Sequence, residues 1–247
     1  MQNVVNALRV LEEVAALQPV GVGELARRVG LPKSTVQRSL RTLHDAGWIR
    51  PAGGEVTRWL LTTKALHVGR RATGELSLRD TARPVMEDLR RRTGETIHLT
   101  VPETDAVVLV ERLETDKPLR IVLPLGIRLP LHASANGKAV LALLPGEVVD
   151  RVLAAGPAGF TGTTLVDPAR IRAELAEVRE RGYADNRGEW RSDIAAVAAA
   201  VPGPDGPVAG LSVSTPASRM PDDLRPEYGA LVREAARTLA TALGHQD

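Results

Sequence analysis

Six polar side chains between positions 33 and 41 could bind a nucleic acid, because each of them can donate hydrogen bonds. The set consists of Lys33, Ser34, Thr35, Gln37, Arg38 and Arg41, and it contains no carboxylate. Side chains with two or more N–H groups suit base edges, and short hydroxyls suit phosphate oxygens. An ordinary solvated helix face usually mixes both signs of charge. This one-sided chemistry favours a DNA recognition surface.

The spacing of apolar residues in the same stretch predicts the helix that would carry these donors. Val36, Leu40 and Leu43 recur at i, i+4 and i+7, so they share one helix face. Pro32 suits a first helical turn, since its missing N–H would be unpaired there. Gly47 can adopt the positive φ that closes a helix. The donors would then occupy the faces turned away from the apolar stripe.

The elements on either side of this helix predict a winged helix-turn-helix. Apolar spacing indicates helices over 3–17 and 24–29, the second closed by Gly30 directly before the donor-rich helix. Residues 48–50 and 56–61 resemble two strands around Pro51-Ala-Gly-Gly54. This hairpin would be the wing. It would place Arg50 and Arg58 against the phosphate backbone, although simple surface charge is an equally good reading of both arginines.

Charge is distributed unevenly along the 247 residues. The chain has a net charge of +2, but residues 1–75 contain eleven Lys and Arg against six Asp and Glu. This asymmetry predicts a basic module that meets a polyanion, joined to a body with another task. There are no cysteines, no apolar run of about 18 residues and no secretory signal. We therefore expect a cytoplasmic protein without disulfides, thiolate metal sites or a membrane partner.

The remainder of the chain predicts an α+β body around an antiparallel sheet. Helices are expected over 64–71, 78–93, 134–144, 168–181 and 226–243, and strands over 96–101, 107–112, 119–123, 194–201 and 208–214. Residues 73–75 would form a hinge. The triplet Arg90-Arg91-Arg92 is expected to stabilise a helix C-terminus in preference to binding DNA.

Several ordered motifs resemble those of the IclR family of bacterial transcriptional regulators, over nearly the whole chain. They are Ala7-Leu-Arg-Val-Leu11, Glu24-Leu-Ala26, Leu31 to Arg38, Trp59-Leu-Leu61, Thr93-Gly-Glu-Thr96, Pro130 to Ala139, Arg181-Gly-Tyr183, Ala195 to Ala198 and Leu211 to Ser214. The resemblance implies a winged helix-turn-helix over 1–63, a linker helix over 64–76 and a GAF-like effector-binding domain over 77–247. That domain would have a curved antiparallel sheet flanked by helices.

The resemblance also implies partners and roles for individual residues. Family members act on operator DNA as dimers or dimers of dimers. Gln37 and Arg38 become candidates for base reading, while Lys33, Ser34, Thr35, Arg41 and the wing arginines become candidates for the remaining DNA contacts. We therefore expect a sequence-specific regulator, a repressor in preference to an activator.

A small organic effector, of acidic type, is expected at the segment that resembles the family's ligand pocket. Backbone amides of Ala135 and Asn136 would bind it at a helix start, where unpaired N–H groups attract anions. The resemblance adds Asn186, Ala196, Ser212 and Ser214 to that pocket. Plain strand alternation explains the two serines equally well. The chain departs from the family pattern at Asp185–Glu189, Asp193 and Ala200, which leaves the ligand open.

No catalytic, metal or cofactor site is expected. Asn136-Gly-Lys138 lacks the first glycine and the Ser/Thr of a phosphate loop, and no Gly-x-Ser-x-Gly elbow is present. The five histidines are scattered, so a zinc site with His98 and His132 could arise only through folding. Two alternatives stay open: a DNA-binding or interaction protein without an effector, and an enzyme domain tethered to DNA.

Overall fold

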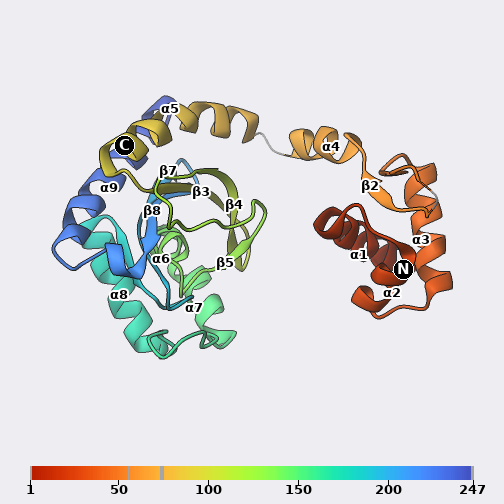
Figure 1. Ribbon diagram of the computed structural model, residues 1–247. Helices are drawn as coiled ribbons and strands as arrows, with labels where there is room; N and C mark the ends of the chain where they lie inside the picture. Colours follow the sequence, from red (N-terminus) through yellow and green to blue (C-terminus); the bar gives the residue numbers. More distant parts are fainter. Residues whose placement is uncertain (1, 55, 73–74, 246–247) are drawn as a thin grey trace. The chain divides into compact units, whose positions relative to one another are not determined.

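The computed structural model describes residues 2–54, 56–72 and 75–245, which form two compact units within 1–76 and 77–247 (Figure 1). The first unit contains α1 (Gln2–Leu17), α2 (Val22–Val29), α3 (Lys33–Asp45), β1 (Ile49–Pro51), β2 (Trp59–Leu61) and α4 (Lys64–Ala72). The three helices before the hairpin confirm the predicted helix-turn-helix.

The core of the first unit is made by the apolar stripes of its helices. Val10 and Val14 of α1 pack with Leu25 of α2 and with Val36 and Leu40 of α3, and all five are almost completely buried. Burial of such stripes contributes most of the stability of short helices. The same packing turns the opposite face of α3 toward solvent.

The hairpin after α3 is shorter than the sequence predicts. Gly47 has a φ of +75°, as expected, and leads into β1. The second strand begins at Trp59 and not at Val56, because Trp59 is the first residue with backbone pairing partners on both sides. It pairs with Pro51 of β1 and also forms a β-bridge with Val20. The exposed residues Val56 to Arg58 belong to the connection between the strands.

The second unit is built on a six-stranded antiparallel sheet with the order β5-β4-β3-β8-β7-β6. Its strands are β3 (Thr96–Pro102), β4 (Ala106–Leu113), β5 (Arg128–Pro130), β6 (Ala184–Arg187), β7 (Ile194–Gly203) and β8 (Gly206–Pro216). Its helices are α5 (Glu75–Thr93), α6 (Ala135–Leu143), α7 (Gly146–Ala154), α8 (Pro168–Arg181) and α9 (Leu224–Ala242), with a 3₁₀ turn at Ala217–Arg219.

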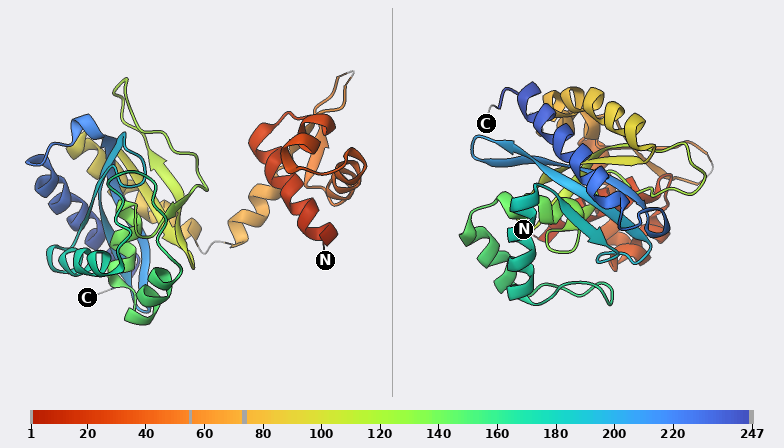
Figure 2. Two further views of the ribbon diagram at one scale, coloured as in Figure 1. Left: turned by 90° about the horizontal axis from the view of Figure 1, so that it is seen from below. Right: turned by 90° about the vertical axis from the view of Figure 1, so that its left-hand side faces the viewer.

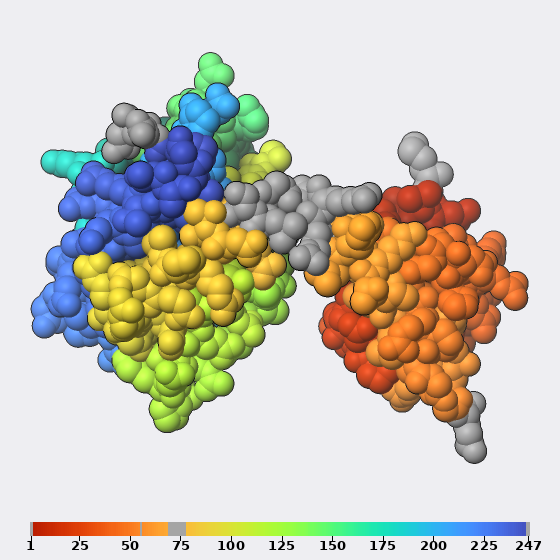
Figure 3. Space-filling view, turned by 90° about the horizontal axis from the view of Figure 1, so that it is seen from above, coloured from red at the N-terminus to blue at the C-terminus, as the bar shows by residue number. Residues whose placement is uncertain are grey.

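Helices cover both faces of this sheet, and strand alternation divides the core between them (Figure 2). Ala195, Val197 and Ala199 of β7 pack with α5 and α9, whereas Ala196 and Ala198 face α6, α7 and α8. Figure 3 shows α5, in yellow, beside α9, in blue, on one side of this unit. The sheet is therefore the middle of three layers.

Two segments differ from the sequence-based expectation. Residues 119–123 form a loop and not a strand. Burial alternates along this loop because Ile121 and Leu123 are buried against the layer of α6, α7 and α8. The third strand lies instead at Arg128–Pro130. The edge strand β6 and helix α7 were not predicted. Thr73 and Gly74 of the expected hinge lie outside the described residues.

The arginine triplet at the end of α5 is engaged by carboxylates. Arg90 pairs with Glu87 at 3.1 Å, Arg91 pairs with Asp88, and Arg92 pairs with Glu234 of α9 at 2.9 Å. The triplet thus stabilises the helix end and its contact with α9. Among the described helices, none combines the length and the apolar character that crossing a bilayer would require.

Candidate functional site

The donor-rich face of α3 is exposed. Val36, Leu40 and Leu43 are buried, and at 100° per residue Ser34, Arg38 and Arg41 project from the opposite side. Lys33 and Gln37 are also exposed, and Thr35 is half-buried. The six candidates therefore surround the solvent face of one helix.

The cations on this face have no acidic partner among the described residues. In the described part of the chain, Lys33, Arg38 and Arg41 form no ion pair, and the Gln37 side chain forms no hydrogen bond. In the same unit, by contrast, Arg28 of α2 pairs with Glu13 at 3.2 Å. Unpaired donors on a rigid helix can bind an external polyanion without breaking internal contacts.

The two wing arginines differ in their surroundings. Arg50 lies exposed on β1, and its side chain makes no polar contact with another described residue. Arg58 precedes β2, and its guanidinium donates a hydrogen bond to the carbonyl oxygen of Pro19 at 2.9 Å. Arg50 is thus the freer cation, and part of the donor capacity of Arg58 is already used.

A second candidate site is a cavity between α6 and the sheet. All six residues expected at the effector pocket line it, namely Ala135, Asn136, Asn186, Ala196, Ser212 and Ser214. Strand register brings the last four together. Ala196 pairs with Asn186 on one side and with Ser214 on the other, and Ser212 lies one pleat further along the same face.

The cavity is small and mixed in character. It has about 30 Å³ of space for water-sized molecules, roughly the room of two waters. Besides the six expected residues, Leu123, Leu129 and Ile194 contribute apolar walls. Trp190 and Arg191 also line it, and the Arg191 side chain is half exposed. This lining suits a compact ligand with at least one polar group, and a ligand larger than two waters requires the cavity walls to move apart.

His98 also lines the cavity, although it was not among the residues that the sequence predicted for the effector pocket. It lies on β3 opposite Ser212 and is buried. Burial, and to a lesser extent the positive charge of Arg112, lowers the pKa of His98 to about 4. The imidazole is therefore neutral at physiological pH.

Two buried polar atoms in this cavity wall have no hydrogen-bond partner within the described chain. They are Nε2 of His98 and Oδ1 of Asn136. The amide nitrogen of Asn136 donates to the hydroxyl of Ser212 at 2.8 Å, so Asn136 is held in place while its oxygen stays unpartnered. Leaving a buried polar atom unpaired costs about 1–3 kcal/mol. A bound molecule that pairs with Nε2 of His98 would remove that cost for the imidazole.

The start of α6 adds backbone donors to the same wall. Ser134 is the N-cap, and its hydroxyl accepts a hydrogen bond from the Gly137 N–H at 3.0 Å. The N–H groups of Ala135 and Asn136 have no acceptor among the described residues. Unpaired N–H groups in a first helical turn favour an anionic group.

Both units match the same family of proteins. The IclR helix-turn-helix domain matches residues 3–53, and the family described as the bacterial transcriptional regulator IclR C-terminal domain matches residues 70–241. The chain belongs to the IclR family of bacterial transcriptional regulators. It is a DNA-binding regulator with the α+β architecture that the sequence predicts.

Individual relatives cover nearly the whole chain. The transcriptional repressor IclR of Escherichia coli K12 is 32% identical over 249 residues, which span 99% of this chain and 90% of that protein. The repressor AllR of Klebsiella pneumoniae is 35% identical over 225 residues, spanning 90% and 82%. Both relatives are transcriptional repressors.

Solved structures give the same result. An IclR homologue from Microbacterium hydrocarbonoxydans, complexed with 4-hydroxybenzoate, has a TM-score of 0.83 and 26% identity over 98% of this chain and 99% of that one. The Thermotoga maritima IclR has a TM-score of 0.81 and 26% identity over 99% and 100%.

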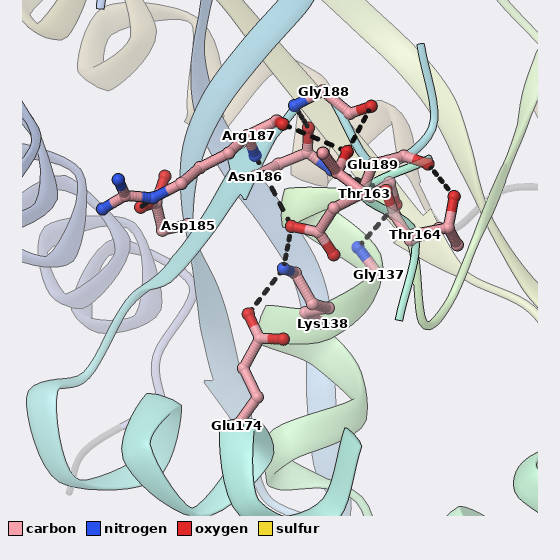
Figure 4. A network of polar contacts seen from close by, with 12 residues as sticks. Gly137, Lys138, Thr163, Thr164, Glu174, Asp185, Asn186, Arg187, Gly188 and Glu189 are labelled. Carbon is pink, nitrogen blue, oxygen red and sulfur yellow. Dashed lines mark hydrogen bonds and ion pairs between the residues drawn. The ribbon is translucent and has the colours of Figure 1, made fainter. Parts of the chain in front are cut away.

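Behind the cavity of this IclR-family protein lies a buried cation. Lys138 of α6 is 1% exposed, and its Nζ lies 2.6 Å from Oε1 of Glu189 and 2.6 Å from Oε1 of Glu174 (Figure 4). Burial raises the pKa of Glu189, and the Lys138 ammonium opposes that rise. Lys138 therefore ties α6 to α8 and to the segment after β6.

The same network fixes the wall residues that follow β6. The hydroxyl of Thr164 donates to the carbonyl oxygen of Glu189 at 2.5 Å, directly before Trp190 (Figure 4). Asn186 donates to the carbonyl of Ala133 at 2.5 Å and accepts from the Gly188 N–H at 3.2 Å. Both the nitrogen and the oxygen of the Asn186 amide thus have partners, whereas Oδ1 of Asn136 has none among the described residues.

Proposed function

We propose that α3 enters the major groove of operator DNA. Gln37 and Arg38 read base edges, while Lys33, Ser34, Thr35 and Arg41 complete the contacts with the duplex. Arg50 and Arg58 of the wing contact phosphates. The supporting observation is that the cations of α3 are exposed on one helix face and have no carboxylate partner in the described part of the chain.

We further propose that the cavity beside α6 binds a small hydroxylated organic acid. The carboxylate accepts hydrogen bonds from the N–H groups of Ala135 and Asn136, and a hydroxyl group pairs with Nε2 of His98 on β3. Ser212, Ser214, Asn186 and Ala196 shape the site. The buried, unpartnered Nε2 of His98 carries this proposal. The relative complexed with 4-hydroxybenzoate, which carries both groups, supports the ligand class.

The ligand would act by changing how the protein engages its operator. We propose a cytoplasmic repressor that binds as a dimer or a dimer of dimers, and whose linker at residues 64–76 transmits the state of the C-terminal domain. A ligand shifts such an equilibrium only by its different affinities for the two arrangements. The repressor names of the relatives support the direction of control.

Calorimetric titration of the full chain with lactate, malate and 4-hydroxybenzoate tests the effector site. We expect saturable binding of at least one acid, and about tenfold or greater weakening in Ser212→Ala, which removes the partner of Asn136. Ser218→Ala, at an exposed serine of the 3₁₀ turn, is the matched control and should bind normally.

Operator binding should respond to the same acid. A labelled fragment from upstream of the gene is titrated with and without the acid that binds, and the apparent affinity is expected to change. If no acid at saturating concentration changes operator binding, the result would support a DNA-binding protein without an effector. Chemical conversion of the bound acid would instead support a tethered enzyme.

A further inference from the structure

A second groove lies at the other end of α6, away from the effector cavity. It is formed by the C-terminal ends of α6 and α8, the far end of β7 and the middle of α9, and its volume is about 240 Å³. Alanine, valine, leucine and proline side chains make its apolar walls. Three arginines, Arg179, Arg233 and Arg237, supply the charge, and no lining residue is shared with the effector cavity.

The charge of this groove is not balanced by lining carboxylates. No aspartate or glutamate lines it, and none of the three arginines forms an ion pair with a described residue. Elsewhere on α8, Arg172 pairs with Asp150 at 2.7 Å. On α9, Glu234 adjoins Arg233 in sequence but pairs with Arg92 at 2.9 Å. The groove is therefore a concentrated positive site on a largely ion-paired unit.

Two of these guanidinium groups are held in place by main-chain carbonyls. Arg179 donates from Nε to the carbonyl of Ala142 at 2.6 Å, and Arg233 donates to the carbonyl of Arg181 at 3.0 Å. Each contact stabilises a helix end, where cations are favoured. Each also uses only part of a guanidinium that carries five N–H donors. The remaining donors are pre-positioned, which lowers the entropic cost of binding a ligand.

We propose that this groove is a second anion-binding site, which takes a small organic molecule bearing a phosphate or several carboxylates. Planar guanidinium groups match the oxygen geometry of both anions. The apolar walls would contact the carbon skeleton of the ligand. The site does not depend on the effector cavity or on DNA binding.

Calorimetric titration of the full chain with pyrophosphate in one arm and citrate in the other tests this site. Saturable binding of at least one anion is expected, and the stronger arm identifies the preferred oxyanion. Arg237→Glu should weaken binding by about tenfold or more, because it replaces attraction by repulsion beside the ligand. Arg237 is exposed, so the variant should keep the wild-type melting temperature.

Arg170→Glu is the matched control. Arg170 is also an exposed arginine of the same unit without an ion pair among the described residues, and it lies at the opposite end of α8. This variant should bind the anion normally. The proposal is overturned if neither anion binds saturably, if Arg237→Glu binds as wild type, or if Arg170→Glu loses as much affinity as Arg237→Glu. Arg237→Gln, a milder change, should give an intermediate affinity.

Discussion

At the scale of single residues, the surroundings of His98 lower the pKa of its imidazole. Its imidazole is buried on β3 with an unpartnered Nε2, and Arg112 lies near enough to disfavour a second positive charge. The pKa of about 4 follows from those surroundings. In the unfolded chain the same group titrates near 6.5. The unfolded state therefore binds a proton between these values while the folded state does not.

This difference predicts a loss of stability in mild acid. Lowering the pH from 7 to 5 should reduce the free energy of unfolding by about 2 kcal/mol through His98 alone, because only the unfolded state gains the proton. Urea denaturation at both pH values measures it. His98→Gln should lose this share of the pH dependence. An equal pH dependence in the variant would show that His98 titrates normally in the fold.

Arg38 and Arg50 should differ in what they contribute to DNA binding. Arg38→Ala is expected to weaken specific binding more than non-specific binding, because we propose that Arg38 contacts base edges. Arg50→Ala should lower the salt slope of binding by about one, with little change in sequence preference. Fluorescence anisotropy at several salt concentrations separates the two effects. Equal effects from both substitutions would contradict this division.

Arg58 should have a smaller effect of the same kind as Arg50. Its contact with the Pro19 carbonyl uses part of its donor capacity, which sequence alone could not show. Arg58→Ala is expected to reduce the salt slope by less than Arg50→Ala does in the same anisotropy series. A larger reduction would mean that the Pro19 contact is given up on DNA.

At the scale of elements, α6 organises the second unit, and Gly137 allows it to approach the sheet. A Cβ at Gly137 would lie 2.6 Å from the Cα of Leu131 and would also overlap the carbonyl oxygen of Pro130. Only glycine avoids these backbone clashes. The close approach places the Ala135 and Asn136 amides against the cavity.

Gly137→Ala should therefore destabilise the protein although alanine favours helices. We expect a loss of about 1–3 kcal/mol from overpacking, measured by urea denaturation. Gly146→Ala is the control, because a methyl group on that helical glycine of α7 would meet no other atom within 4 Å. It should be neutral or slightly stabilising. Equal losses at both positions would refute the packing explanation.

Lys138 follows Gly137 on the same helix and connects this helix to neighbouring segments through two ion pairs. Lys138→Met should cost about 3 kcal/mol or more, because Glu174 and Glu189 would lose their buried cation. The double variant Lys138→Met with Glu189→Gln should recover part of that loss in the same denaturation experiment. A double variant less stable than Lys138→Met alone would contradict this role for the buried cation.

The sequence predicted the elements that have their own periodicity or terminators, and it missed those that depend on distant partners. The stripe of α3 and the Ser134 start of α6 could be recognised locally. The strand β6 is a short polar edge that exists only because Ala184 to Arg187 pair with β7. Residues 119–123 alternate like a strand but have no strand partner.

The same reasoning applies to the candidate site. The six cavity residues could be expected from a helix start and from family motifs. His98 and Lys138 could not, since His98 meets Ser212 through register, and Glu189 reaches Lys138 across 51 positions of the chain. Whether a buried polar atom has a partner is a property of the folded chain and not of any local pattern.

At the scale of the whole molecule, the two units divide the chemistry between them. The residues up to position 75 carry an excess of five basic side chains, whereas the rest carries an excess of three acidic ones. Charge on the first unit favours DNA through release of counterions, and we propose that the exposed donors on α3 add sequence preference. The second unit holds the cavity.

The central claim is that α3 reads a specific DNA sequence. A competition mobility-shift titration at moderate salt tests it, with DNA from upstream of the gene against a shuffled fragment of equal length. We expect the upstream fragment to bind about a thousandfold more tightly, within the range of specific recognition. Equal affinity for the two fragments across the salt series would contradict the claim.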